Sequence, residues 1–215
     1  MTATAGANRY VKAVLWDMDG TLMNSQPIWD ESFRRRCQER GGTVTPEQVT
    51  GIAGTSIART CELIAETGAT ASPEDPATAE VFAKISARVE AAVRADPPIL
   101  PGVRSITAML NEIGLAQVIV TQSPRPIVEA VAHALGDVFV ELVTGDDGLP
   151  GKPTLAPYAA AIELLGLSPE ECVVVEDSAT GAVSARSNDL RVIQVGGETK
   201  LFPGDRSIED RKSVV

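Results

Sequence analysis

Hydrophobic residues occur along the chain in two kinds of run. Short, nearly continuous runs rich in β-branched residues predict buried strands of the parallel type. They lie at 10–16, 117–121, near 138–143, at 172–176 and at 191–195. Longer runs with an apolar residue every three or four positions predict helices. These cover 27–40, 46–54, 57–67, 77–95, 103–113, 126–135, 157–165 and 181–187, and we expect an irregular tail after Gly196.

The order of these elements indicates the fold class. Strands and helices alternate from residue 99 onward, whereas 24–98 is almost entirely helical. We therefore predict an α/β protein, a Rossmann-like parallel sheet core with an inserted all-α domain. The core would comprise 1–23 and 99–215, and the insertion 24–98. The alternative, two consecutive domains, leaves the N-terminal strand without partners.

Composition excludes several classes of function. Nineteen Lys+Arg face 29 Asp+Glu, a formal net charge of −10, which argues against a nucleic-acid or anionic-lipid partner. A single histidine, His133, rules out sites built from several histidines, and its helical setting predicts a structural role. Three widely spaced cysteines, no signal-peptide pattern and no membrane-length apolar run predict a cytoplasmic protein.

Two carboxylates follow the first predicted strand directly. Asp17 and Asp19 stand one residue apart in the run DMDGTL, at a sheet edge where α/β proteins bind ligands. One carboxylate can attack or bind metal while the other handles a proton. Gly20 permits the tight turn that turns backbone N–H groups toward an anion. Alone, the pattern could equally be a solvated Asp-Gly turn.

Three further signals follow in order along the chain. Thr121 ends the second core strand, Lys152 lies in a Gly-Lys-Pro loop, and Glu176 and Asp177 end another strand. Each taken singly could be a strand end, a surface lysine or a helix cap. Together with the Asp pair at one edge of the sheet, they predict a site for phosphate and Mg²⁺, which prefers hard oxygen ligands.

The same runs resemble the motifs of the haloacid-dehalogenase-like hydrolases with a helical cap. DMDGTL is similar to the first motif, VIVTQS to the second, GKP with the downstream PY to the third, and VVVEDSATG to the fourth. Within that superfamily the sequence is most similar to the sugar-phosphatase and β-phosphoglucomutase group. The resemblance implies that 24–98 is a cap domain, and it covers nearly the whole chain.

The resemblance also implies a role for each matching residue. Asp17 would be the nucleophile that forms an aspartyl-phosphate, and Asp19 the acid and base. The phosphate-binding residues would be Gly20, Thr121, Gln122 and Lys152. Mg²⁺ would be held by Asp17, Asp19 through its backbone carbonyl, Glu176 and Asp177. We therefore expect a Mg²⁺-dependent phosphatase for a small phosphorylated metabolite, most simply a sugar phosphate, acting as a monomer or weak homodimer.

Some positions depart from the group's pattern. Asn24 and Gln26 stand where relatives carry carboxylates, at the hinge into the cap. Trp29 and Ile57 stand where β-phosphoglucomutase-like enzymes carry a histidine and an arginine, although Arg59 is close enough in sequence to substitute. The departures at Trp29 and Ile57 favour hydrolysis, whereas those at Asn24 and Gln26 would either soften repulsion of an anionic substrate or alter closure of the cap. The alternatives are a β-phosphoglucomutase-like phosphomutase and a non-catalytic binding protein on the same scaffold.

Overall fold

One parallel sheet organises the protein. The structure, a computed structural model, describes residues 11–196 and the short strand at 206–207. Six strands run parallel in the order β3-β2-β1-β4-β5-β6. Their bounds are β1 Ala13–Trp16, β2 Ala116–Val120, β3 Glu141–Val143, β4 Cys172–Glu176, β5 Arg191–Gln194 and β6 Arg206–Ser207. The predicted α/β class with a parallel sheet is confirmed.

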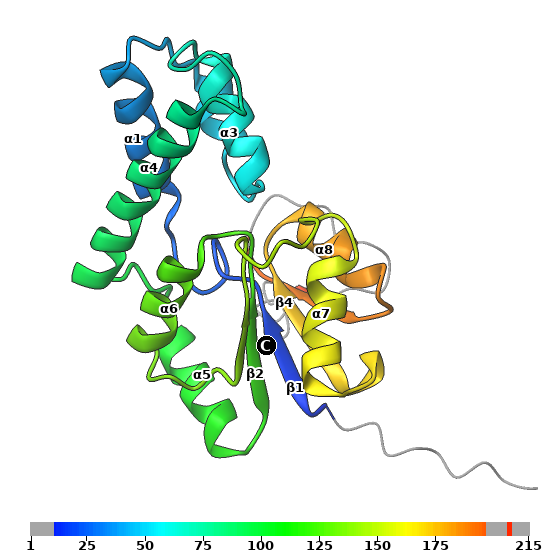
Figure 1. Cartoon of the computed structure of the whole chain (residues 1–215). Helices are drawn as coiled ribbons and strands as arrows, with labels where there is room; N and C mark the ends of the chain where they lie inside the picture. Colours follow the sequence, from blue (N-terminus) through cyan, green and yellow to red (C-terminus); the bar gives the residue numbers. More distant parts are fainter. Residues whose placement is uncertain (1–10, 197–205, 208–215) are drawn as a thin grey trace, which may run out of the picture.

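Helices cover both faces of the sheet, and a separate group of helices lies beyond the carboxyl ends of the strands (Figure 1). Five helices lie between β1 and β2 along the chain, and the first four are α1 Gln26–Glu39, α2 Pro46–Gly51, α3 Ile57–Glu66 and α4 Pro76–Ala95. The others are α5 Val103–Glu112, α6 Arg125–Ala134, α7 Ala156–Leu165 and α8 Ala179–Arg186, with a 3-10 turn at Pro169–Glu171. We call α1 to α4 the helical unit.

Alternation along β1 divides the core between the two faces of the sheet. Val14 and Trp16 pack with residues of α6 on one face, while Ala13 and Leu15 pack with residues of α7 and α8 on the other. Buried strands sandwiched between helices explain the continuous apolar runs in the sequence. Buried residues of the helical unit, Phe33 and Ile85 among them, form a third cluster of their own.

A buried polar chain ties β1 to its neighbour. The indole nitrogen of Trp16 donates to Gln117 Oε1 at 3.1 Å, and Gln117 Nε2 donates to the Thr107 carbonyl at 2.9 Å. Each polar group in this series of hydrogen bonds has a partner, so the Trp16 and Gln117 side chains are buried without loss of hydrogen bonding. This arrangement fixes the end of β1 that leads into Asp17.

Some predicted elements differ from those observed. The strand predicted near 138–143 begins only at Glu141, a few residues after Asp137, which has a left-handed φ of 53°. The helix predicted for 46–54 ends at Gly51. The tail predicted to be irregular contributes β6, which pairs with β5. The rest of the predicted tail, and Tyr10 at the start of the first predicted strand, lie outside the described residues.

Two further sequence expectations can be compared with the structure. His133 is exposed on α6, with 80% of its side chain accessible, and lies 3.2 Å from Asp137. His133 therefore lies on the surface of α6 rather than in the core. Among the described residues, no helix combines the length and apolarity that a membrane crossing requires.

Candidate active site

The predicted site residues meet at the carboxyl edge of the sheet. β1 pairs with β2 on one side and β4 on the other, and Trp16 aligns with Ile119 and Val175. Asp17 therefore emerges between the strands that end before Thr121 and at Glu176. The chain order reverses between β1 and β4, and such a switch point opens the crevice in which α/β proteins bind ligands.

Lys152 joins two of the carboxylates. Its Nζ lies 2.7 Å from Asp17 Oδ1 and 2.7 Å from Glu176 Oε1, with only 3% of the lysine side chain exposed. The ring centroid of Tyr158 lies 5.0 Å from the same ammonium, and the Tyr158 hydroxyl is 3.4 Å from Glu176 Oε1. A buried charge persists only with such partners, so the lysine is built into the site.

Secondary contacts hold the loop that carries Lys152. Asn188 Nδ2 donates to the Leu155 carbonyl at 2.9 Å, and the Ser184 hydroxyl donates to the Thr154 carbonyl. Both donors belong to α8 or the turn that follows it. The lysine's loop is therefore attached to the helix that begins just after Asp177.

Burial and mutual repulsion perturb the carboxylates. Burial raises the pKa of Asp17 well above the usual aspartate range, and Glu176 and Asp177 add to this against the opposing effect of Lys152. Burial and Glu176 also raise the pKa of Asp177 to about 6. For Lys152, burial disfavours the charged form, but the neighbouring carboxylates outweigh it and raise the pKa. The cluster thus holds more negative charge than one lysine balances.

This charge imbalance fits a divalent cation. Asp17, Glu176 and Asp177 each offer a carboxylate oxygen, and these atoms lie within 4.8 Å of one another. Asp17 Oδ2 is buried and accepts no hydrogen bond from the described residues. An all-oxygen donor set with one unused buried oxygen suits Mg²⁺. Glu176 is fully buried and is fixed by Ser178, whose N–H and hydroxyl donate to Oε2 at 2.8 and 2.9 Å.

Two glycines make room for these carboxylates. Gly20 has φ +94°, and a Cβ there would lie 2.0 Å from Asp177 Oδ2. A Cβ on Gly181 would lie 1.4 Å from Glu176 Oε1. Both distances are far inside van der Waals contact, so only glycine permits the carboxylates their positions. Ser178, rather than either carboxylate, caps α8 by accepting from Gly181 N–H at 3.0 Å.

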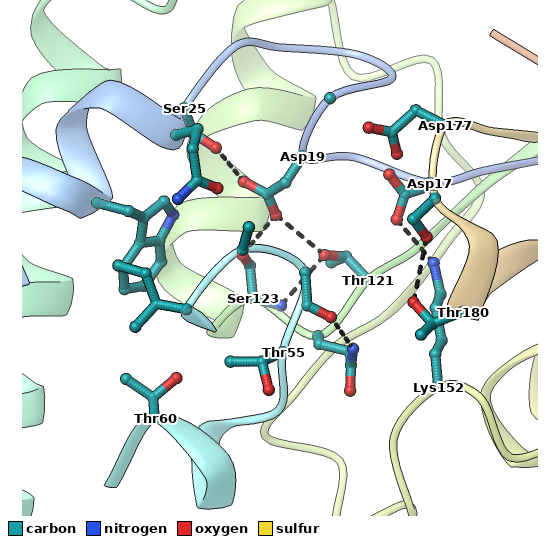
Figure 2. Close-up of a pocket in the computed structure, with 18 of the residues that line it drawn as sticks. Asp17, Asp19, Ser25, Thr55, Thr60, Thr121, Ser123, Lys152, Asp177 and Thr180 are labelled. Carbon is teal, nitrogen blue, oxygen red and sulfur yellow. Dashed lines mark hydrogen bonds and ion pairs between the residues drawn. The ribbon is translucent and has the colours of Figure 1, made fainter. Parts of the chain in front are cut away.

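Asp19 lies apart from the lysine and is surrounded by hydroxyl groups (Figure 2). Its Oδ2 accepts from Ser123 at 2.6 Å and from Thr121 at 3.3 Å, and its Oδ1 accepts from Ser25. Ser123 N–H in turn donates to Thr121 Oγ1 at 3.1 Å. The Asp19 side chain is thus oriented separately from Asp17, Glu176 and Asp177.

Gln122, the remaining predicted phosphate ligand, contacts the helical unit. Its Nε2 donates to the Gly54 carbonyl at 2.6 Å, and its Oε1 is buried next to Gly151. This contact could not be predicted, because Gly54 lies in a turn between α2 and α3 whose position depends on the whole insertion. The phosphate-binding role of Gln122 stays a prediction.

A pocket of about 380 Å³ connects all of these groups. Its floor carries every predicted site residue except Glu176, which lies buried behind Lys152. Its opposite wall comes from the helical unit, with Trp29 and Thr60 among the lining residues. Arg59 does not line it; the guanidinium pairs with Glu62 and Glu66 at 2.7 Å each on the outer surface.

Sequence reasoning gave no role to Ser25, and it included Tyr158 only as part of the PY run matched to the third motif. A serine before a helix is read as an N-cap, yet Ser25 makes no side-chain capping bond and donates to Asp19 instead. Pro27 lies in the first turn of α1, where a residue needs no backbone N–H donor. A helix that can start there without a side-chain cap was the available signal that the Ser25 hydroxyl could bond elsewhere. Tyr158 lies a few residues after Lys152 in the sequence. Only the structure reveals that its side chain is fully buried.

Comparison with known proteins agrees with this architecture. A curated relative, hexitol phosphatase B of Escherichia coli, is 28% identical over 191 residues, 87% of this chain and 84% of its own. A phosphorylated carbohydrates phosphatase of Thermotoga maritima is 30% identical over 211 residues, covering 95% and 90%. The crystal structure of CbbY from Rhodobacter sphaeroides in complex with phosphate superposes with a TM-score of 0.77 at 24% identity, covering 92% of each chain.

The family is shown by a match to most of the chain. The family model described as haloacid dehalogenase-like hydrolase matches residues 11–189, which include every site residue discussed above. The chain belongs to the haloacid dehalogenase-like hydrolase family.

Proposed function

We propose that this protein is a Mg²⁺-dependent phosphatase that hydrolyses a small phosphorylated metabolite through an aspartyl-phosphate on Asp17. The observation that carries the proposal is the position of Lys152, 2.7 Å from both Asp17 and Glu176 in a largely buried site. Phosphatases among the relatives, including those named for hexitols and phosphorylated carbohydrates, support a sugar or polyol phosphate as the substrate.

The chemistry divides between the two aspartates. An Asp17 oxygen would attack phosphorus, forming the aspartyl-phosphate, while the bond from phosphorus to the alcohol oxygen breaks. Asp19 would give its proton to the departing alcohol and then take one from the water that attacks phosphorus and releases phosphate. Asp19 lines the pocket, and its side chain is oriented for both proton transfers by the hydroxyl groups of Thr121, Ser123 and Ser25.

Charge neutralisation is the main requirement of such a site. The reaction brings an anionic carboxylate to an anionic phosphate, so positive charge must offset the repulsion. Lys152 supplies one such charge, and Gly20 and Thr121 line the same floor. Mg²⁺, held by Asp17, Glu176, Asp177 and the Asp19 backbone carbonyl, would supply further positive charge to the phosphoryl oxygens.

We further propose that 24–98 acts as a cap over a core formed by 1–23 and 99–215. The pocket lies between the two, and closure would exclude water from the reacting groups. A monomer or weak homodimer in the cytoplasm, with a small phosphorylated metabolite as its partner, is the corresponding proposal for its state and setting.

Hydrolysis is favoured over phosphoryl transfer within one sugar. A mutase has to hold a second phosphate in the cap, and Arg59, the one candidate identified from sequence for that task, is paired with glutamates outside the pocket. No observation supports a binding protein without activity.

The proposal is tested by measuring phosphate release from a panel of phosphorylated sugars and polyols, with Mg²⁺ and with EDTA. We expect release from at least one compound with Mg²⁺ and background rates with EDTA. Turnover unaffected by EDTA would exclude the metal, and a flat panel with Mg²⁺ would exclude the function.

A further inference from the structure

The wall of the pocket that faces the catalytic floor is uncharged. It is formed by the helical unit, all of whose residues the structure describes. Neither lysine nor arginine from this unit lines the pocket, and its acidic residues are absent from the lining as well. The ionisable groups of the lining are confined to the floor: Asp17, Asp19, Lys152 and Asp177.

The nearby cations are committed elsewhere. Arg59, in the first turn of α3, does not line the pocket and pairs with Glu62 and Glu66. Lys152 is enclosed by Asp17 and Glu176 and faces the position of the reacting phosphoryl group. A second anionic group on the substrate would therefore meet no positive side chain beyond the floor.

Such a group would also lose its hydration without compensation. The floor residue that contacts the start of the helical unit is Asp19, which accepts from the Ser25 and Ser123 hydroxyl groups and supplies no counter-charge. An anion taken out of water without a counter-charge loses solvation that nothing in the wall replaces. The pocket thus discriminates against a leaving group with a carboxylate or second phosphate.

What the wall does offer is a mixture of apolar and neutral polar groups. Trp29, Ile52, Ile57 and Phe82 supply apolar surface, while Gln26, Thr55 and Thr60 supply hydroxyl and amide groups. Apolar surface with a few neutral polar groups is suited to a polyhydroxy compound, whose C–H groups pack and whose hydroxyls form hydrogen bonds. At about 380 Å³, the pocket has room for a small molecule of this kind.

Resting on the proposed phosphatase function, we propose that the substrate is a monophosphate ester of an uncharged polyhydroxy alcohol or sugar, in which the phosphate is the only anionic group. Selectivity arises from the uncharged wall of the helical unit, which binds neutral leaving groups and leaves anionic ones unpaired.

The test compares substrates that differ by one anionic group. One pair is glucitol 6-phosphate and 6-phosphogluconate, and another is fructose 6-phosphate and fructose 1,6-bisphosphate. Hydrolysis of p-nitrophenyl phosphate with Mg²⁺ reports the catalytic floor independently, and each compound is also measured as a competitor of that reaction. In each pair, we expect the compound whose phosphate is its only anionic group to be favoured by about tenfold to a hundredfold in kcat/KM or in competition.

A charge introduced into the wall should reverse this selectivity. Thr55 lines the pocket in the turn before α3 and is not among the proposed catalytic residues. Thr55→Lys is expected to bring the two members of each pair within about threefold of each other by improving the anionic one. Thr55→Gln, of similar length but neutral, should keep the wild-type preference.

The outcomes separate the two proposals. A preference of the wild type for the anionic member of both pairs, with p-nitrophenyl phosphate hydrolysed, overturns the substrate inference and leaves the phosphatase standing. Equal effects of Thr55→Lys and Thr55→Gln on the pairs also overturn it. Absence of hydrolysis and of competition across all compounds overturns the phosphatase, and the substrate inference with it.

Discussion

Gln122 donates a 2.6 Å hydrogen bond from Nε2 to the carbonyl oxygen of Gly54. The donor follows β2 in the sheet core, and the acceptor lies in the turn between α2 and α3 of the helical unit. The bond therefore spans the pocket rim, directly beside the Thr121 and Ser123 contacts to Asp19. The residue that joins the two parts therefore adjoins the residues that orient Asp19, and one short segment, 121–123, makes both sets of contacts.

Loss of this bond should loosen the turn at 52–56. For Gln122→Met, which keeps the side-chain length but removes the donor, we expect faster amide hydrogen exchange at 52–56. We also expect kcat/KM to fall about two- to tenfold, the effect of one hydrogen bond. Unchanged exchange in that turn would contradict a role for Gln122 in closure.

The hydroxyl groups around Asp19 should affect turnover more than binding. Ser123→Ala removes the 2.6 Å donor to Oδ2, and we expect kcat to fall about fivefold to tenfold with KM little changed. Steady-state kinetics at saturating Mg²⁺ measures both constants. Ser32→Ala is the matched control, since Ser32 is buried in α1 and its hydroxyl has no partner among the described residues. An equal loss in both variants would show a general packing effect.

Gly181 should tolerate no side chain. Gly181→Ala places a Cβ 1.4 Å from Glu176 Oε1, which must displace that carboxylate. We expect the free energy of unfolding to fall by about 1–3 kcal/mol, as for other overpacked sites, together with activity. Urea denaturation and phosphate release provide the measurements. Gly51→Ala is the control, because its Cβ would meet Leu63 at an ordinary 3.5 Å; similar losses there would contradict the explanation.

Removing the buried ammonium should leave two carboxylates uncompensated. For Lys152→Met in metal-free buffer, we expect the free energy of unfolding to fall by about 3 kcal/mol, as when one partner of a buried ion pair is lost. With saturating Mg²⁺, phosphate release by Lys152→Met should fall to background. Lys12→Met, which removes an ion pair to Glu171 from a lysine 60% exposed, should change stability by less than about 1 kcal/mol. An unaltered unfolding midpoint for Lys152→Met would show that the charges are not coupled.

Residues at strand ends could be predicted from the sequence because parallel strands finish at one edge. Asp17, Thr121 and Glu176 follow apolar runs directly, so their approximate meeting required only the fold class. Lys152 could be assigned to the site but not placed, since a loop held by Ser184 and Asn188 decides where its ammonium lies.

Contacts between the two parts of the chain could not be predicted. The Gln122 bond to Gly54, the Ser25 bond to Asp19 and the outward position of Arg59 all depend on how the helical unit lies against the sheet. A helical pattern gives the buried face of α3 but not the neighbours of its exposed residues. Which residues of the helical unit line the pocket could not be predicted for the same reason.

Asp17 is the proposed nucleophile. This role is tested by the rate of phosphate release by Asp17→Asn with saturating Mg²⁺, compared with wild type and with Asp137→Asn, which changes an exposed aspartate far along the chain. We predict background release for Asp17→Asn and wild-type release for Asp137→Asn. Release by Asp17→Asn near the wild-type rate would exclude Asp17 as the nucleophile.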